Sequence, residues 1–532
     1  MDLLFYNGII HSVDNSDNIY DAIGIKNGKI AFLGSNEEAS KIDSKKRINL
    51  ENKLMLPGFM DTHIHLMYYA LSKDSVDLSS CSSVEEIIEK SKSFLSEKGT
   101  SLGWLTGRGW NQNNFTGTKR FLTKHDLDKI STEYPIACHR VCGHLVSVNT
   151  LALEKVLSLE ESESLKDYID EENGILRESA VMLLNKLMDD VTIEDLKNWI
   201  VQSQQDLNKH GITTVHSADF IGLEEDIWEE IIKAYKELEK ENKMTVKVYE
   251  QCMFLDKNNI DDFIQKGYKT GQGSSLFKIG PLKLILDGSL GAKTAAMIEP
   301  YSDDNSNCGI LNFSKEQLKE TIKKAYDNDL QVAVHGIGDK AIEMIIDTYS
   351  ELDKLYPKKD RRNGVVHAQF TNQELLDKLA KNNILAYIQP IFINDDMPIV
   401  QTRVGKERMN KIYAWKSMRD MNIHTTGSSD APIASFSVLE NIYCATTRKN
   451  LKGKPDDGWL ADEILTVDEA VRLFTTDSAY ASFEEDKKGS LEIGKCADLV
   501  VLDKNIYEID PNDIINTNVL MTVLDGKIVF NK

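Results

Sequence analysis

Eight short apolar segments, most of them separated by amphipathic helical patterns, place the strongest constraint on how this chain folds. We expect strands at residues 55–61, 211–217, 246–252, 282–286, 331–335, 364–367, 384–389 and 423–427. Helical periodicity falls at residues 193–209, 225–240, 315–327, 340–355, 372–381 and 438–447. Strands that alternate with helices at this repeat length form parallel sheets, and eight such units favour a closed (β/α)8 TIM barrel. An open, doubly wound sheet has the same periodicity, so the alternation by itself leaves both architectures open.

Both ends of the chain have the pattern of β-hairpins. Asn7-Gly8 and Asn27-Gly28 each separate two strand-like runs, and Asp525-Gly526 does the same near the C-terminus. An isolated hairpin is only marginally stable in water. We therefore expect the two ends, including the run at 497–502, to pair into one small β-sandwich domain.

The first two expected barrel strands lie too far apart for a single helical crossover. Residues 66–192 are therefore expected to form an insertion, and an insertion after the C-terminal end of a barrel strand lies beside the active site. We interpret it as a lid or substrate-pocket subdomain. The expected α/β organisation is 1–54 and 481–532 in the β-sandwich domain, 55–65 in the first barrel strand, 66–192 in the insertion and 193–480 in the rest of the barrel.

Charge and cysteine usage argue against several classes of protein. Among the 532 residues, 63 Lys+Arg stand against 84 Asp+Glu, and the formal net charge of -21 disfavours nucleic-acid and anionic-membrane partners. The seven cysteines are scattered, which argues against a disulfide framework and a cysteine-rich zinc site. No apolar run reaches the roughly 20 residues that span a bilayer, and the first residues do not resemble a secretory leader. We expect a cytoplasmic protein that acts on a small molecule, as a homodimer by base rate.

The strongest chemical signal is the pair His63 and His65, which follows Pro57-Gly58 at the end of the first expected barrel strand. Residues two apart on a strand point to the same side. Two imidazoles at a strand end can therefore bind one Zn²⁺ or a similar ion. Two surface histidines would give the same sequence, but the position at the end of an apolar strand favours the metal site.

Three later strands also end in side chains that could ligate a metal. His335 and His367 each close an apolar run, and Asp430 follows the last strand. Barrel enzymes place their catalytic groups at this end of the strands. Taken singly, such a histidine is more often hydrogen-bonded in a core, and Asp430 could cap the next helix. Together these residues favour a metal centre, with Asp430 as a ligand or as the general base for a hydrolytic water.

These residues, with several ordered stretches of sequence, resemble one family. The HxH pair, His335, His367 and Asp430 resemble the amidohydrolase superfamily, and the closer similarity is to its YtcJ-like subgroup, which includes N-substituted formamide deformylases. The resemblance covers essentially the whole chain. Its further stretches are GRGWNQ (107–112), GHLVSVN (143–149), GILRESA (174–180), KLILDGSLGA (283–292) and GSLEIGKCADL (489–499).

The resemblance implies that Lys283 is the metal ligand of the fourth strand and is carboxylated by CO₂ on its amine. A neutral lysine that captures CO₂ becomes a carbamate anion, which can bridge two cations. The sequence by itself does not choose Lys283 over Lys278 or Lys293, and an ion-paired lysine is the alternative. With this carbamate as a bridge, the implied ligands of one ion are His63, His65 and Asp430, and those of the second are His335 and His367.

The insertion contributes three candidate pocket residues by resemblance: Trp110, His144 and Asn149. His144 could polarise a carbonyl and stabilise its oxyanion, and Trp110 could form an apolar wall. For Asn149, hydrogen bonding inside the insertion is an equally good explanation. His216 ends the second expected strand, but the resemblance gives it no ligand role.

The predicted activity is metal-dependent hydrolysis of a carbon–nitrogen bond in a non-peptide amide or formamide-like compound. One or two divalent ions, expected to be zinc, would lower the pKa of a water molecule and polarise the carbonyl. Asp430 would take the water proton and return it to the departing amine. The alternatives are an isomerase or ester hydrolase on the same scaffold, since a fold does not fix its reaction, and a non-catalytic binding protein that kept the barrel.

Overall fold

The computed structural model describes residues 1–141, 145–221, 227–254, 256–358 and 360–532. The chain divides into two compact units, one formed by Met1–Tyr68 together with Ile200–Lys532 and the other by Tyr69–Trp199. The first unit contains the barrel and the paired chain ends. The second is a smaller α/β unit with a core of its own.

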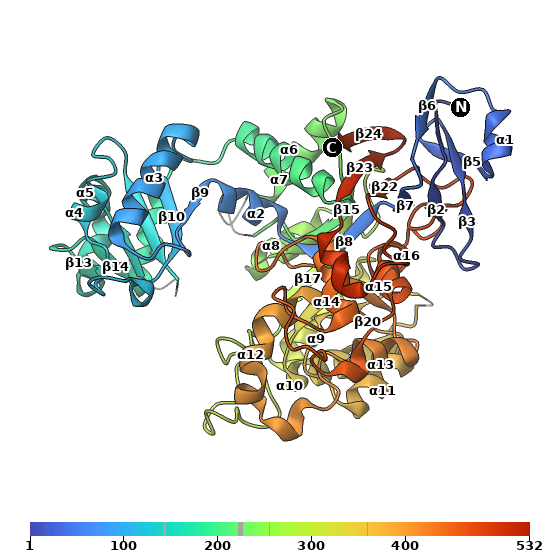
Figure 1. The fold of residues 1–532 in the computed structure, drawn as a ribbon. Helices are drawn as coiled ribbons and strands as arrows, with labels where there is room; N and C mark the ends of the chain where they lie inside the picture. Colours follow the sequence, from blue (N-terminus) through green and yellow to red (C-terminus); the bar gives the residue numbers. More distant parts are fainter. Residues whose placement is uncertain (142–144, 222–226, 255, 359) are drawn as a thin grey trace. The chain divides into compact units, whose positions relative to one another are not determined.

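An eight-stranded parallel sheet forms the centre of the first unit (Figure 1). Its first and last strands meet just beyond their ends, where the Asp430 N–H donates to the His63 carbonyl at 2.8 Å and the His65 N–H donates to the Ala431 carbonyl at 2.9 Å. These bonds close the sheet into a barrel. The predicted (β/α)8 architecture is therefore confirmed, and the open, doubly wound alternative is excluded. The strands, in sheet order, are β8 (Phe59–Ile64), β15 (Ile212–Ser217), β16 (Lys247–Met253), β17 (Phe277–Ile285), β18 (Val332–Gly336), β19 (Gly364–His367), β20 (Leu385–Ile388) and β21 (Thr425–Gly427).

The helices that follow the barrel strands lie close to the positions that the periodicity predicted. Three have the expected bounds to the residue: α6 (Ile193–Lys209), α9 (Lys315–Asp327) and α14 (Val438–Thr447). The start of α9 is set by Ser314, whose side chain accepts a hydrogen bond from the Gln317 N–H in a capping box. The other helices of the barrel unit after β15 are α7 (Trp228–Lys240), α8 (Lys257–Gln265), α10 (Asp339–Leu355), α11 (Gln373–Lys381), α12 (Ile393–Val404), α13 (Trp415–Asp420), α15 (Val467–Leu473) and α16 (Thr476–Ala481).

The strand expected at residues 55–61 is in fact two strands with different partners. β7 (Leu54–Pro57) pairs with β2 (Ile9–His11) and with β22 (Leu499–Leu502), whereas the first barrel strand begins at Phe59. The chain changes sheets at Gly58, where a Cβ would lie 2.4 Å from the Thr213 hydroxyl oxygen, so a side chain has no room. Residues 55–57 therefore belong to the β-sandwich and not to the barrel.

The hairpin expected across Asn7-Gly8 does not form. β1 (Leu3–Tyr6) pairs with β4 (Ala22–Lys26) and β6 (Lys46–Asn49), while β2 pairs in another sheet with β3 (Ile19–Tyr20) and β7. Phe5 of β1 and Ile10 of β2 lie in one shared hydrophobic core. By crossing from one sheet to the other, the chain buries apolar side chains between two sheets, which a lone hairpin cannot do.

Both chain ends contribute to the resulting β-sandwich (Figure 1). One sheet has the order β5-β4-β1-β6, and the other has the order β24-β23-β22-β7-β2-β3, so the two ends are hydrogen-bonded at β22 and β7. The other two predicted hairpins are confirmed. Asn27-Gly28 joins β4 to β5 (Lys29–Gly34), and Asp525-Gly526 joins β23 (Val519–Leu524) to β24 (Lys527–Asn531), with positive φ at every turn residue.

The second unit has a six-stranded sheet with hydrophobic side chains packed on both faces. Trp110 and Ile136 pack with α3 (Val84–Lys98) in one cluster, and Val146 packs with α5 (Thr150–Leu157) in the other. Its strands, in sheet order, are β13 (Ile169–Asp170), β14 (Ile175–Arg177), β12 (Leu145–Val148), β11 (Ile136–Arg140), β10 (Leu105–Trp110) and β9 (Ser75–Asp77).

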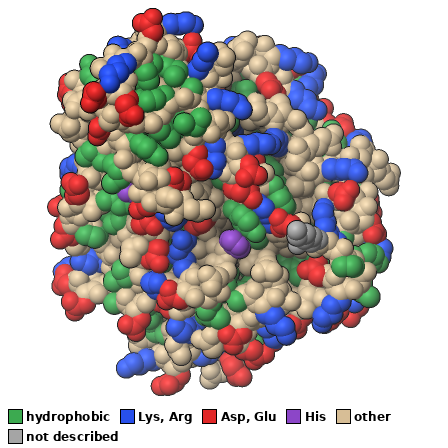
Figure 2. Space-filling view, turned by 90° about the vertical axis from the view of Figure 1, so that its right-hand side faces the viewer, with side chains coloured by type: hydrophobic (Ala, Val, Ile, Leu, Met, Phe, Trp, Pro, Cys, Tyr) green, Lys and Arg blue, Asp and Glu red, His purple; other side chains and the backbone are tan. Residues whose placement is uncertain are grey.

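Charged side chains of both signs are interspersed on the face drawn in Figure 2, and no broad basic field gathers there. Throughout the described part of the chain, no helix is both long enough and apolar enough to cross a membrane.

Candidate metal centre

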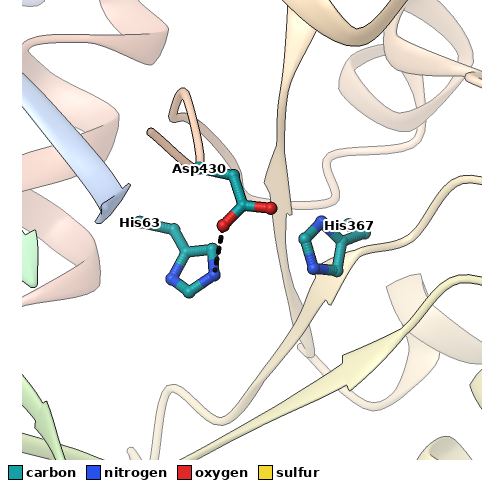
Figure 3. Close-up of side chains that lie close together, drawn as sticks. All are labelled: His63, His367 and Asp430. Atoms are coloured by element: carbon teal, nitrogen blue, oxygen red, sulfur yellow. Dashed lines mark ion pairs between the residues drawn. The ribbon is translucent and has the colours of Figure 1, made fainter. Parts of the chain in front are cut away.

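Asp430 lies among the predicted histidines at one mouth of the barrel. Its Oδ1 atom is 3.3 Å from Nε2 of His63 and 3.2 Å from Nε2 of His65. The ring centroid of His367 lies 5.7 Å from that of His63 and 4.4 Å from that of His335. Figure 3 shows the Asp430 carboxylate between the imidazoles of His63 and His367, with an oxygen facing each. The sequence-predicted set of four histidines and one aspartate therefore meets in one place.

The backbone holds two of these side chains in an unusual conformation. His367 has a φ of 80° and Asp430 has a φ of 60°. Non-glycine residues in this region carry a strain of about 1–3 kcal/mol, and such residues concentrate at functional sites. Both follow the C-terminal ends of parallel strands, which is where a barrel places its reactive groups.

Hydrogen bonds determine which ring nitrogen of His63 and His65 faces Asp430. Nδ1 of His63 lies 2.7 Å from Oε1 of Gln251, whose own Nε2 donates to the Thr62 carbonyl. Nδ1 of His65 lies 3.0 Å from the Ala218 carbonyl oxygen. Both partners accept hydrogen bonds, so each Nδ1 carries the proton and each Nε2 presents a lone pair toward Asp430.

His367 and His335 are oriented in a similar way, but through opposite nitrogens. Nδ1 of His367 lies 2.9 Å from Oε1 of Gln389, so its Nε2 carries the lone pair. Nε2 of His335 lies 3.0 Å from the Gly288 carbonyl oxygen, so its lone pair is on Nδ1. Asp287, which also lies 3.4 Å from Nε2 of His335, is held by three backbone N–H groups. Such partners are typical of metal-ligating histidines, because they fix ring orientation and tautomer.

Burial favours the neutral form of His63, His335 and His367. It lowers the pKa of His63 to about 4 and that of His335 to about 3, and it holds the pKa of His367 well below its ordinary value. Burial acts to raise the pKa of Asp430, but a proton shared with His63 or His65 outweighs burial and holds that pKa well below its usual range. Once that proton is lost, lone pairs and an anionic carboxylate face one another, an arrangement that a cation would stabilise.

Lys283 lines the same cavity from β17 and is only 2% exposed. Burial lowers its pKa to about 8, so roughly a tenth of the amine is neutral at pH 7 instead of less than a thousandth. The other two candidate lysines are ion-paired: Lys278 with Glu484, and Lys293 with Asp303 at 3.1 Å. The geometry thus distinguishes Lys283 from Lys278 and Lys293, a choice that the sequence by itself left open.

Two of the three candidate insertion residues, Trp110 and Asn149, are buried inside the second unit. Trp110 is fully buried in the core of the second unit, and its Nε1–H donates to the Cys138 carbonyl at 2.9 Å, so it does not present an exposed pocket wall. Asn149 is also fully buried, and it caps α5 by accepting from the Ala152 N–H while its Nδ2 donates to two carbonyls. Internal hydrogen bonding therefore accounts for Asn149. His144 lies outside the described residues, and its role stays a prediction.

Several polar residues that support the site went unpredicted. Gln251 and Gln389 orient two histidines, and Asp61 accepts hydrogen bonds from both the hydroxyl and the N–H of Ser429, which fastens β8 to the segment after β21. The sequence signal that could have revealed these residues is a polar side chain within or next to an otherwise apolar strand. His216 is not among the residues that line the cavity; it is buried with its ring 4.9 Å from that of Tyr249.

A cavity of about 300 Å³ opens at the mouth of the barrel in the first unit. It contains the four histidines, Lys283 and Asp430, and the rest of its described wall is hydrophobic or aromatic. The lining residues are His63, His65, Tyr68, Ile221, Met253, Lys283, Ile285, His335, His367, Asp430 and Ile433.

The chain belongs to the amidohydrolase family, whose model matches residues 46–530, and this membership together with the strand-end site identifies it as a hydrolase. The chain is 30% identical to the YtcJ protein of Bacillus subtilis (strain 168) over 544 residues, with 100% of both chains covered. It is 23% identical to the N-substituted formamide deformylase of Arthrobacter pascens over 554 residues, covering 100% of this chain and 98% of that one. A solved metal-dependent hydrolase from Pyrococcus horikoshii OT3 matches with a TM-score of 0.80 and 27% identity, covering 96% and 99% of the two chains. The predicted resemblance is confirmed.

Proposed function

We propose that this protein is a metal-dependent amidohydrolase that hydrolyses the carbon–nitrogen bond of a non-peptide, formamide-like amide. One observation carries the proposal. Nε2 of His63 and Nε2 of His65 lie 3.3 and 3.2 Å from one carboxylate oxygen of Asp430, while acceptors occupy both Nδ1 atoms. A divalent cation neutralises such a cluster, because imidazole and carboxylate are both ligands of zinc and related ions.

The donor set fits this cation. One ligand atom each from His63, His367 and Asp430 lies within 4.8 Å of the others, and nitrogen and oxygen donors suit zinc. In the proposed arrangement His63, His65 and Asp430 would hold one ion, and His335 with His367 would hold a second. When bound, the metal supplies Lewis acidity, which lowers the pKa of water and polarises a carbonyl.

Asp430 is the proposed general base. Its low pKa keeps the carboxylate ionised at neutral pH, so it can accept a proton from the attacking water. It then returns that proton to the nitrogen of the departing amine as the C–N bond breaks, which balances the hydrolysis. Acceptors on Gln251 and Ala218 hold the Nδ1 protons of His63 and His65, so those two histidines keep their orientation throughout.

Lys283 is the proposed bridging ligand, as a carbamate. Its buried amine has a neutral fraction that can attack CO₂, forming a C–N bond and releasing one proton. The measurement is recovery of bound metal when stripped protein is reloaded with and without bicarbonate. We expect bicarbonate to increase loading of the wild type but not of Lys283→Met. Equal loading of the wild type under both conditions would contradict the carbamate.

The function itself is tested on purified protein that has been stripped of metal and reloaded with Zn²⁺. Substrates are a panel of formamides, acylamines and matched esters, and the readout is the released amine or alcohol. We expect amine release from formamides or acylamines that depends on metal. Turnover of esters alone would favour the ester-hydrolase alternative, and no turnover of any substrate by metal-loaded protein would oppose an amidohydrolase.

A further inference from the structure

The wall of the cavity beside the proposed metal centre is apolar. Ile221, Met253, Ile285 and Ile433 line it together with the ring of Tyr68. Met253 and Ile285 end β16 and β17, so they lie at the same level of the barrel as the strand-end histidines. Among the described lining residues, the acidic and basic side chains are Asp430, Lys283 and the four histidines. All of them belong to the proposed metal centre.

Ile433 is the most unusual part of this wall. Its side chain is 63% exposed, although most large aliphatic residues of the described chain are buried. The Ile433 N–H donates to the Asp430 carbonyl at 2.9 Å, so a tight turn ties this exposed side chain to the proposed base. Single exposed aliphatic side chains are common on protein surfaces, so what distinguishes Ile433 is that it also lines the cavity that contains Asp430.

A charged group of the substrate placed against this apolar wall would lose hydration without gaining an oppositely charged partner from the described residues of the wall. Desolvating an ion that is left unpaired is strongly unfavourable, whereas an apolar group gains from the same burial. The volume also limits size, because a cavity of roughly 150 Å³ suffices to hold benzene. At about 300 Å³, the cavity has room for a reacting amide and about one ring.

Resting on the proposed function, we infer that the substrate carries an uncharged, apolar substituent of about one ring next to its scissile bond, and that Ile433 is a residue that selects for it. Tyr68 and Ile221 form the rest of the receiving surface with Met253 and Ile285. A carboxylate or ammonium at the same position of the substrate is rejected, because the side chains of Ile221, Met253, Ile285 and Ile433 offer it neither charge nor hydrogen bonds.

Binding without turnover tests this most directly. Isothermal titration with metal-loaded protein uses 4-phenylbutan-2-one, which has a ring and a carbonyl but no C–N bond to cleave. Its para-carboxylate and para-aminomethyl derivatives are the charged probes. We expect the neutral ketone to bind at least about tenfold more tightly than either charged probe, equivalent to roughly 1.4 kcal/mol. Equal affinities, or no binding of the neutral ketone, would overturn the inference.

Substitutions at Ile433 give the matched comparison. Ile433→Asp should weaken binding of the neutral ketone about tenfold, since it removes apolar contact and adds a charge, and Ile433→Lys should selectively improve binding of the para-carboxylate. The control is Ile493→Asp, because Ile493 is 69% exposed and is not among the cavity-lining residues. Its affinity should match the wild type. An unchanged affinity in Ile433→Asp would overturn the role given to this residue.

The same variants separate failure of this inference from failure of the proposed function. Hydrolysis of neutral and charged anilides at equal kcat/KM would sustain the function and overturn the substrate class. Selective binding of the neutral ketone, lost in Ile433→Asp, would support the substrate class even if no amide were hydrolysed.

Discussion

Nδ1 of His63 on β8 lies 2.7 Å from Oε1 of Gln251 on β16, which is two strands further along the barrel sheet. The amide of Gln251 is itself held, because its Nε2 donates to the Thr62 carbonyl at 2.9 Å. A neighbour of the candidate ligand thus decides which imidazole nitrogen carries the lone pair. The geometry of the candidate metal centre therefore depends on a residue that is not one of its candidate ligands.

Gln251→Ala should weaken metal binding without removing a ligand. Loss of such a partner typically lowers metal affinity about 10- to 100-fold, because His63 is then free to rotate or change tautomer. The measurement is Zn²⁺ affinity by competition with a chromophoric chelator. Gln251→Glu keeps an acceptor for Nδ1 and should retain more affinity than the alanine variant. Wild-type affinity in Gln251→Ala would show that the hydrogen bond does not position the ligand.

Asp430→Asn should lower kcat about 10²- to 10⁴-fold at saturating metal, the range expected for loss of a general base. The amide cannot accept a proton as a carboxylate does, although its oxygen can still ligate a cation. Steady-state kinetics and metal content should be measured on the same sample, so that loss of chemistry is separated from loss of metal. A fully active, metal-loaded Asp430→Asn variant would rule out the proposed base.

Asn149→Ala should destabilise the second unit by about 2–4 kcal/mol, because it removes a helix cap and leaves buried backbone groups unpaired. Denaturant unfolding followed by circular dichroism measures the effect. Ser83→Ala removes the N-cap of α3 and should cost about 1 kcal/mol. If Asn149→Ala were as stable as the wild type but had a raised KM, the predicted substrate role would be favoured over the structural one.

Ionisation of Glu484 should make the free energy of unfolding depend on pH in the acidic range. Burial acts to raise its pKa, but Lys488 and Lys278 outweigh burial and lower it to about 2 from an ordinary value of 4.5. A carboxyl whose pKa is depressed by folding stabilises the protein above its unfolded pKa, and that stabilisation is lost as the pH falls from about 4.5 to about 2.

Glu484→Gln should therefore lower the free energy of unfolding by about 3 kcal/mol at pH 7, since it leaves buried lysine charge without its partner. The difference from the wild type should shrink as the pH falls toward 2. Glu229→Gln, which neutralises one of the two carboxylate partners of the exposed Lys266, should change stability by about 0–1 kcal/mol. A difference for Glu484→Gln that does not depend on pH would contradict the ion pairing.

The barrel was predictable because its strands and helices are marked by local periodicity. Several helix bounds agree to the residue, and His63, His65, His335, His367 and Asp430 could be grouped because parallel strands end at one mouth. Sheet membership was less predictable. Residues 54–60 form a run without a polar side chain, and the change of sheet at Gly58 depends on its close approach to Thr213, which local sequence does not encode.

The supporting residues and the insertion show a second limit of sequence reasoning. Gln251 and Gln389 act through hydrogen bonds to histidines far away in the chain, so they become recognisable only once the strands are placed. Trp110 and Asn149 occur in family-like stretches, yet their polar atoms are used inside the second unit. Resemblance drew attention to these stretches but did not distinguish packing from substrate contact.

Metal content is the most direct test of the central claim, that the strand-end histidines and Asp430 hold a divalent cation. Wild-type protein, a His63→Ala/His65→Ala variant and a His424→Ala control should be dialysed against Zn²⁺ and then metal-free buffer, and analysed by mass spectrometry. His424 is a suitable control because its ring stacks on Tyr480 at 4.1 Å and it is not among the cavity-lining residues. The account predicts about one or two zinc ions per chain in the wild type and the control, and a clear loss in the double variant. Equal metal content in all three proteins would contradict it.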